Sequence, residues 1–291
     1  MISDLKYILI SMRPKQWVKN TFVFAGLIFS RHLLDIALLA KVSAGFVMFS
    51  LASSSIYIFN DIKDIEKDRE HPEKCKRPLA AGHLQVTKAY LASTLLAMTS
   101  LVVSFLLETN FFLIIAAYLI MNTAYSIKIK HIVILDVMCI ACGFVFRVLA
   151  GTTLAGVGPS DWLILCTITI SLFLGFSKRR DELVLLDANA NNHRTVLTEY
   201  SMTFLDQMIS VATACTVIAY ALYTISDETV ARFGTKNLIF TIPFVIYGIY
   251  RYLYLTYHKQ TSGNPTTAVL TDLPLFINGL LWFSAVILII Y

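Results

Sequence analysis

Residues 60–68 read Asn-Asp-Ile-Lys-Asp-Ile-Glu-Lys-Asp and follow directly on the apolar run of residues 37–60. These residues place carboxylates at the end of a segment long enough to cross a bilayer. On a helix that advances about 100° per residue, Asp61, Asp64 and Asp68 lie within roughly a 60° arc. Three carboxylates on one face repel each other, so we expect them to bind Mg²⁺, which bridges them to a phosphorylated substrate. The alternative is a solvated helix whose acids pair with Lys63 and Lys67.

The composition is typical of a membrane protein. Hydrophobic residues make up 57% of the chain and charged residues 15%, with a mean hydropathy of +0.68, whereas soluble domains carry about 25% charged residues. We therefore predict an all-α, polytopic protein that forms a single domain over residues 1–291, with about nine membrane-spanning helices. The expected spans are 17–33, 37–60, 86–106, 109–127, 132–153, 161–177, 203–226, 236–257 and 272–290.

The placement of basic residues predicts the orientation in the membrane. With the N-terminus inside, most of the 24 Lys and Arg residues fall in segments that face the cytoplasm, as the positive-inside rule requires. The two long polar connections, about 61–85 and 178–202, then lie on the cytoplasmic side of the inner membrane. The net charge of +5 belongs to loops near anionic lipid, so it gives no reason to expect a nucleic-acid partner.

A basic segment follows the aspartates. Lys74, Lys76 and Arg77 could contact phosphate oxygens beside the metal, with Arg binding through a bidentate fork. Arg77 is the strongest candidate, because the adjacent Pro78 stiffens its backbone. Anchoring by the positive-inside rule is the alternative explanation for these cations.

The motifs over residues 60–82 resemble a known family. Asn-Asp-x-x-Asp-x-x-x-Asp, followed by Asp68-Arg69-x-His71-Pro72 and then by Arg-Pro-Leu-Ala-Ala-Gly over residues 77–82, is similar to the first signature of the UbiA superfamily of intramembrane prenyltransferases. The resemblance implies nine transmembrane helices around a central cavity that opens to the cytoplasmic side. It also implies Mg²⁺ and a diphosphate bound at that side.

The second motif distinguishes branches of this superfamily. Where aromatic prenyltransferases carry a second aspartate-rich motif, residues 177–187 place three cations before the acids. Lys178-Arg179-x-x-Glu182-Leu183 is similar to the decaprenyl-phosphate phosphoribosyltransferase branch. That likeness implies transfer of 5-phosphoribosyl from phosphoribosyl diphosphate to a polyprenyl phosphate. It also implies the substrate-binding residues Lys19, Asn20, Asn60, Arg77, Tyr125, Lys130, Arg147, Lys178, Arg179 and Glu182. An i,i+4 salt bridge is the simpler reading of Lys178 and Glu182.

Arg147 is a charge inside a predicted span. Such a group costs several kcal/mol unless it faces a polar cavity or a partner. It lies within about 20° of Asp136 on the helical face. We expect Arg147 to contact a substrate phosphate or ribose; an ion pair between helices is the alternative.

Two other functions fit parts of the sequence. Prenyl transfer to an aromatic acceptor would use the same first motif, and would need Asp181 and Asp187 as acids. An ion-coupled transporter would hold its ionisable groups near the bilayer midplane, whereas here the acids cluster at the ends of spans. Under every reading membrane lipids are partners, and the sequence leaves open whether the chain forms a homo-oligomer.

Overall fold

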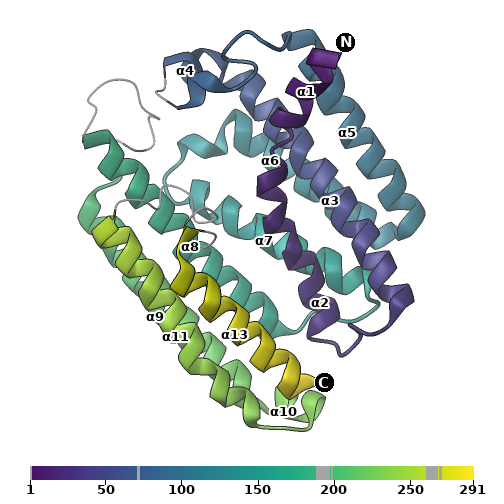
Figure 1. Ribbon diagram of the computed structural model, residues 1–291, viewed down its shortest axis with the longest axis vertical. Helices are drawn as coiled ribbons and strands as arrows, with labels where there is room; N and C mark the ends of the chain where they lie inside the picture. Colours follow the sequence, from purple (N-terminus) through teal and green to yellow (C-terminus); the bar gives the residue numbers. More distant parts are fainter. Residues whose placement is uncertain (1, 71–72, 188–196, 198, 260–267, 269–270) are drawn as a thin grey trace. The chain divides into compact units, whose positions relative to one another are not determined.

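The computed structural model describes residues 2–70, 73–187, 197, 199–259, 268 and 271–291, and this part of the chain is all helical, with no strand (Figure 1). Its long helices are α3 (Ile36–Lys63), α5 (Val86–Leu107), α6 (Thr109–Ile127), α7 (Leu135–Leu154), α8 (Asp161–Asp187), α9 (Met202–Ile225), α11 (Ile242–Tyr254) and α13 (Leu273–Ile290). Its shorter helical elements are α1 (Ile2–Ser11), η1 (Pro14–Phe24), α2 (Ala25–Ile28), α4 (Ile65–Glu70), η2 (Lys74–Lys76), η3 (Ile129–His131), α10 (Asp227–Phe233), η5 (Asn237–Thr241) and η6 (Leu255–Lys259).

Eight helical segments of the described chain are long and apolar enough to cross a membrane. They correspond to eight of the nine expected spans. The all-α, multi-pass architecture predicted from the sequence is thereby confirmed.

The expected first span, 17–33, has a different structure. Residues 14–24 form the 3-10 helix η1, and only the single turn of α2 continues it as α-helix. Pro14 opens η1 at a position where its missing N–H costs nothing. Polar side chains then interrupt the segment at Lys15, Lys19 and Asn20, and the buried Asn20 side chain hydrogen-bonds to α3. The segment therefore packs through specific polar contacts rather than as a uniformly apolar helix.

The described residues group into two compact units. The first contains Met1–Cys139 and Phe146–Gly158; the second contains Ile140–Val145, Pro159–Asn191 and Thr195–Tyr291. In the first unit α3 packs against α5, α6 and η1. Its core is formed by Val23, Leu27, Val42, Phe49, Phe111, Ile115 and Leu154, together with neighbouring apolar side chains.

Glycines allow η1 and α2 to approach α7 closely within the first unit. A Cβ atom on Gly151 would lie 1.7 Å from the Val23 carbonyl oxygen, and one on Gly26 would lie 2.7 Å from the Thr152 backbone nitrogen. Only a residue without a side chain fits such a backbone-to-backbone contact. These two glycines therefore fix where the 3-10 segment lies.

In the second unit α8 packs on α9, and α11 packs on α13 and α9. Polar pairs tie these helices together: the Trp282 indole donates to the Tyr220 hydroxyl at 2.9 Å, and Arg251 binds Asp272 through two bonds of 3.0 and 2.8 Å. Asp272 also caps the start of α13 by accepting from the Leu275 N–H. These contacts give Arg251 a structural partner at the end of the neighbouring helix.

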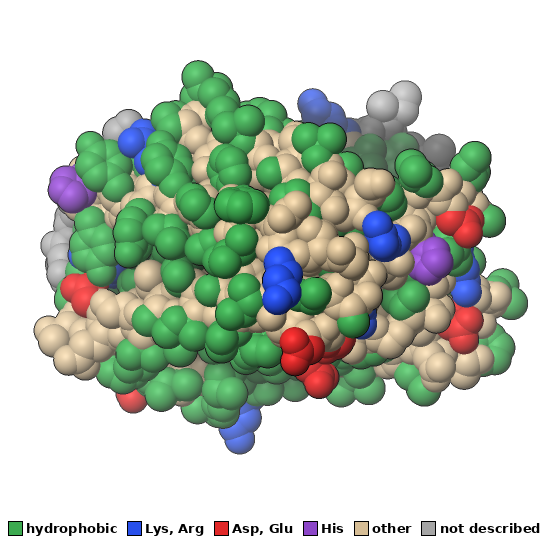
Figure 2. All heavy atoms as spheres, turned by 90° about the horizontal axis from the view of Figure 1, so that it is seen from below, with side chains coloured by type: hydrophobic (Ala, Val, Ile, Leu, Met, Phe, Trp, Pro, Cys, Tyr) green, Lys and Arg blue, Asp and Glu red, His purple; other side chains and the backbone are tan. Residues whose placement is uncertain are grey.

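Apolar side chains cover much of the outer surface of the helices. On α5, for example, Leu91, Leu95, Met98, Val102 and Leu106 are all more than half exposed. The face drawn in Figure 2 carries hydrophobic side chains over a large part of its area, with acidic and basic side chains scattered among them. Such a surface is stable against lipid and would aggregate in water, as expected for a multi-pass membrane protein.

Candidate active site

The aspartates of the first motif lie where α3 gives way to α4. Asp61 is in the last turn of α3, Asp64 is its C-cap, and Asp68 lies in α4. The predicted helix across this stretch is interrupted at Asp64, whose φ of −104° and ψ of 11° leave the helical region. The Asp68 N–H still bonds the Asp64 carbonyl at 2.8 Å. The chain therefore turns at Asp64, and the three aspartates lie on the two sides of this turn, at the end of α3 and in α4.

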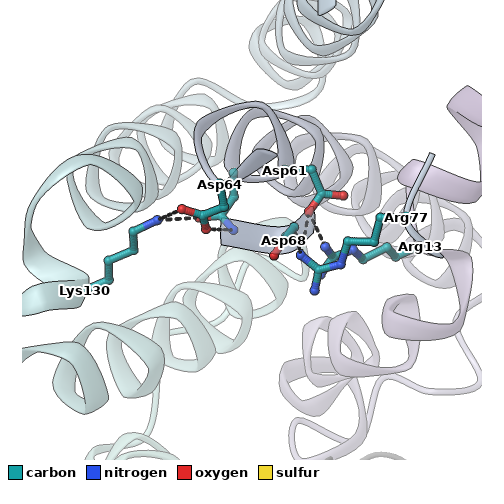
Figure 3. Close-up of polar contacts among 7 residues, drawn as sticks. Arg13, Asp61, Asp64, Asp68, Arg77 and Lys130 are labelled. Carbon is teal, nitrogen blue, oxygen red and sulfur yellow. Dashed lines mark hydrogen bonds and ion pairs between the residues drawn. The ribbon is translucent and has the colours of Figure 1, made fainter. Parts of the chain in front are cut away.

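Asp61 and Asp68 share one arginine. Asp61 is 2% exposed and accepts hydrogen bonds from Arg13 and, at 3.1 Å, from Arg77. The same Nη1 of Arg77 contacts Asp68 at 2.6 Å. Figure 3 shows Arg13 and Arg77 reaching these two carboxylates from the same side. Two arginines and two aspartates thus form one ion-paired group.

Asp64 points the other way, toward Lys130 (Figure 3). The Lys130 ammonium lies 2.6 Å from Oδ1 of Asp64 and 3.5 Å from the Asn60 amide oxygen. The Asn60 amide donates in turn to Oδ2 of Asp64 at 3.1 Å. Lys130 is only 4% exposed, so its charge depends on these partners for compensation. The predicted site residues Asn60, Asp64 and Lys130 therefore form a second polar group.

The loop of residues 77–84 holds Arg77 in place. The Ala81 N–H bonds the Arg77 carbonyl at 2.8 Å, and the His83 N–H bonds the Pro78 carbonyl at 2.8 Å. Leu79 and Leu84 are buried against α3 and α5 residues. Arg77 itself is extended, with ψ 144°, as expected for a residue before proline. The Arg-Pro-Leu-Ala-Ala-Gly motif is thus a packed turn that presents one guanidinium to the aspartates.

Arg13 is a site residue that the sequence analysis did not single out. Its φ of 54° places it in the left-handed region, which is costly for a non-glycine residue. Buried Met12 anchors the junction, and its carbonyl accepts a hydrogen bond from Ser54 of α3 at 3.0 Å. The Arg13 guanidinium also lies over the Tyr57 ring at 5.2 Å. Its sequence signal was the family resemblance of residues 13–20, from which Lys19 and Asn20 were selected and Arg13 was not.

Asn20 and Arg147 form a third, deeper group in the first unit. Arg147 of α7 is 5% exposed; its Nε donates to the Asn20 amide oxygen at 2.8 Å, and its guanidinium lies over Phe49 and Tyr118. The Asn20 amide nitrogen donates to Ser50 and Ser53 of α3. These serines continue a polar stripe along α3 that contains Ser50, Ser53, Ser54, Tyr57 and Asp61. Asp136 is fully buried near the start of α7.

The second motif lies in the second unit, at the end of α8. Lys178 pairs with Glu182 at 3.7 Å, and Arg179 pairs with it at 2.5 Å. The i,i+4 salt bridge is therefore present, but the fully buried Arg179 is the closer partner. Arg180 pairs with Asp206 of α9 at 2.7 Å and stacks on the Tyr257 ring.

The other predicted residues are placed as follows. Lys19 is half-buried in η1, and Tyr125 is half-buried in the last turn of α6. Asp181 is buried, 6% exposed. His71 and Pro72 lie outside the described residues.

Comparison with known proteins identifies the family. A model of the UbiA prenyltransferase family matches residues 21–280. The chain belongs to this family. The predicted resemblance to UbiA enzymes is confirmed, and with it the prediction of a UbiA-type transferase.

Relatives with curated names extend the match. The chain is 34% identical over 294 residues to a decaprenyl-phosphate phosphoribosyltransferase of Mycolicibacterium smegmatis, covering 97% of this chain and 91% of that protein. It is 32% identical over 280 residues to a protein of the same name from Mycobacterium tuberculosis strain H37Rv, covering 95% and 91%. A UbiA homologue of Archaeoglobus fulgidus, solved with GPP and Mg²⁺, superposes with a TM-score of 0.74 at 19% identity, covering 98% and 99% of the two chains. At that identity the likeness establishes the UbiA fold alone.

The donor atoms at the first UbiA motif suit a hard cation such as Mg²⁺. Carboxylate and amide oxygens from Asn60, Asp61, Asp64 and Asp68 are the available ligands, and oxygen is what Mg²⁺ prefers. Within the described residues, however, no three acidic, His or Cys side chains converge in a metal-holding group. Each aspartate faces a basic side chain instead. The oxygen atoms of the motif therefore suit Mg²⁺, and in this structure the aspartates are engaged in ion pairs.

Proposed function

We propose that the protein transfers a 5-phosphoribosyl group from phosphoribosyl diphosphate to a polyprenyl phosphate, in a reaction that requires Mg²⁺. The observation that carries this proposal is the similarity over almost the whole chain to named decaprenyl-phosphate phosphoribosyltransferases. The cluster of acids and bases at the end of α3 supports it, because the donor is a highly charged anion whose leaving group needs cations.

The donor diphosphate would bind at the first motif. Asp61, Asp64 and Asp68 would hold the metal, and Arg77 and Lys130 would contact phosphate oxygens. Arg77 and Lys130 each lie within 2.6 Å of an aspartate oxygen, so they are within reach of a group bound to those acids. Asn60, which already bonds Asp64, would orient that carboxylate. Mg²⁺, when bound, would neutralise negative charge on the diphosphate leaving group.

The acceptor needs little activation by the protein. A lipid phosphate monoester is anionic at neutral pH, so its oxygen can attack the ribose C1 without a strong general base. The C1–oxygen bond to the diphosphate breaks as the new C1–oxygen bond forms, and diphosphate leaves with the bonding electrons. Lys178 and Arg179 would bind phosphate groups of the acceptor or donor. Glu182, which pairs with both, would fix their positions.

Asn20 would act through Arg147. Its amide nitrogen donates hydrogen bonds to two serines of α3, and its amide oxygen accepts one from Arg147. It therefore holds the guanidinium in one orientation. Arg147, Lys19 and Tyr125 are proposed to contact the ribose or a phosphate group.

The experiment uses purified protein, decaprenyl phosphate, phosphoribosyl diphosphate labelled in the ribose, and Mg²⁺. We expect labelled lipid only when metal, acceptor and intact Asp61 are all present. If the folded wild-type protein forms no labelled lipid with Mg²⁺ and both substrates present, the proposal is refuted.

A further inference from the structure

The three aspartates at the end of α3 are all ion-paired. In the contacts that the structure describes, Asp61, Asp64 and Asp68 pair with three cations, Arg13, Arg77 and Lys130. Asp61 and Lys130 are almost fully buried, and the two arginines are about one-quarter exposed. The charges of Asp61 and Lys130 are therefore compensated by partners instead of by water, and the two arginines keep only part of their hydration.

This arrangement disfavours the binding of a metal ion that arrives without an anion. A divalent cation that bound the aspartates alone would displace the arginines and lysine, and would leave them as uncompensated charges in a partly buried site. Removing one partner of a buried pair is strongly unfavourable. A diphosphate that arrives with the metal reverses this penalty, because its oxygens accept the displaced cations.

The contacts of Arg13 allow its side chain to exchange Asp61 for a diphosphate oxygen. Its guanidinium contacts only Asp61 and the face of Tyr57 among the described residues. Its strained backbone is held by Met12 and Ser54 rather than by the side chain's own ion pair. The side chain can therefore change partner while its Cα stays fixed. A strained residue held in this way is a marker of a functional position.

We propose that Arg13 is a diphosphate ligand that occupies Asp61 until metal and diphosphate arrive, so that the two bind with strong positive coupling. Arg77 and Lys130 take part in the same exchange. The inference rests on the proposed function only in taking the donor to be a diphosphate; it does not depend on the donor's carbon group.

The test measures binding, with inorganic diphosphate as the anion. Equilibrium dialysis of radiolabelled diphosphate against detergent-purified protein gives its Kd with and without free Mg²⁺. Electron paramagnetic resonance of free Mn²⁺ gives the affinity for metal alone. In the wild-type protein we expect Mg²⁺ to tighten diphosphate binding by about 5- to 150-fold, the usual range of coupling between two ligands, and Mn²⁺ alone to bind weakly.

Arg13→Gln separates this proposal from a merely structural role. Removing the competing cation should tighten binding of Mn²⁺ alone, while diphosphate binding in Mg²⁺ weakens by about tenfold and the coupling shrinks. A structural role would weaken both ligands together or leave both unchanged, and either result would overturn the proposal. Arg232→Gln, which breaks an exposed pair with Glu228, is the matched control and should bind both ligands like the wild type.

Arg13→Lys keeps the proposal testable if Arg13→Gln does not fold. It retains the charge but loses the bidentate fork. Mn²⁺ alone should then still bind weakly, and diphosphate binding in Mg²⁺ should fall several-fold. Unchanged diphosphate binding would contradict the proposal. A protein that shows the coupling but makes no phosphoribosyl lipid would refute the proposed donor and leave this inference standing.

Discussion

Asp61 is a buried carboxylate that pairs with two arginines and is also a proposed metal ligand. It is nearly inaccessible to solvent and compensates two arginines that come from distant parts of the chain. Its charge therefore organises the junction of α1 and η1 as well as the loop of residues 77–84. The same carboxylate is proposed to bind the metal.

We expect Asp61→Asn to lower the rate of phosphoribosyl transfer by about 100-fold or more, because it removes a metal ligand and the charge that orders both arginines. Asp35→Asn is the matched control. It makes the same substitution at the other end of α3, where Asp35 caps the helix and Asn caps equally well. The rate of labelled-lipid formation is the measurement; a rate for Asp61→Asn above one-tenth of that of the control would contradict the assignment.

Asn20 is expected to matter for stability. Asn20→Ala removes the buried acceptor of the Arg147 Nε–H and the buried donor to the Ser50 and Ser53 hydroxyls of α3, at a cost of about 1–3 kcal/mol. We expect a clear fall in the thermal unfolding temperature of the purified protein. Asn237→Ala, at an exposed position, should change the unfolding free energy by less than about 0.5 kcal/mol. Equal unfolding temperatures for the two variants would show that the Asn20 contacts contribute nothing.

The sequence predicted the acids of the site better than their partners. Asp61, Asp64 and Asp68 could be found because their spacing is local and falls at the end of an apolar run. Arg13 meets Asp61 across 48 residues and Lys130 meets Asp64 across 66. Such pairs depend on how η1 and η3 pack on α3, which no local pattern encodes. Lys130 was found through the family resemblance alone.

At the scale of elements, the 3-10 segment η1 joins the site to the core. It begins one residue after Arg13 and passes Trp17 and Asn20, both of which bond serines of α3. It ends where Gly151 and Gly26 let it meet α7. The site cations of the N-terminal segment are thus positioned by packing that lies away from the aspartates.

Gly151→Ala should disturb this packing. The added Cβ would lie 1.7 Å from the Val23 carbonyl oxygen, so backbone must move, at a cost of about 1–3 kcal/mol. We expect a lower thermal unfolding temperature. Gly279→Ala in α13 is the control: its Cβ would meet no atom within 4 Å, and alanine favours the helix. A Gly151→Ala protein as stable as the control would rule out the close contact.

The long helices were predictable because a run of about 20 apolar residues has few alternatives in a bilayer. The sequence suggested a span over 17–33 because residues 22–29 are all apolar or glycine, although Lys19, Asn20 and Arg31 lie near the ends of the segment. Its 3-10 geometry follows from Pro14 and from side chains such as Asn20 that bond specific groups on α3. Hydropathy averages over such contacts and cannot detect them.

For the whole molecule, the distribution of basic residues predicts which side of the membrane holds the site. We expect Cys75, in the loop after Asp68, to face the cytoplasm. In a variant whose other four cysteines are replaced by serine, a membrane-impermeant maleimide should label Cys75 in inside-out vesicles. It should not label Cys75 in intact spheroplasts. The reverse pattern would mean that the positive-inside rule has been misapplied to this chain.

Mass spectrometry of the lipid product would identify the group that the protein transfers. Purified protein would receive Mg²⁺, decaprenyl phosphate and phosphoribosyl diphosphate together with geranyl diphosphate and 4-hydroxybenzoate. We predict a single new lipid, decaprenyl phosphate carrying one phosphoribosyl group. The NMR coupling constant of its anomeric proton should show that the anomeric centre is inverted relative to the donor, as in-line attack requires. Formation of geranylated 4-hydroxybenzoate and no phosphoribosyl lipid would rule out phosphoribosyl transfer and assign the protein to aromatic prenyl transfer.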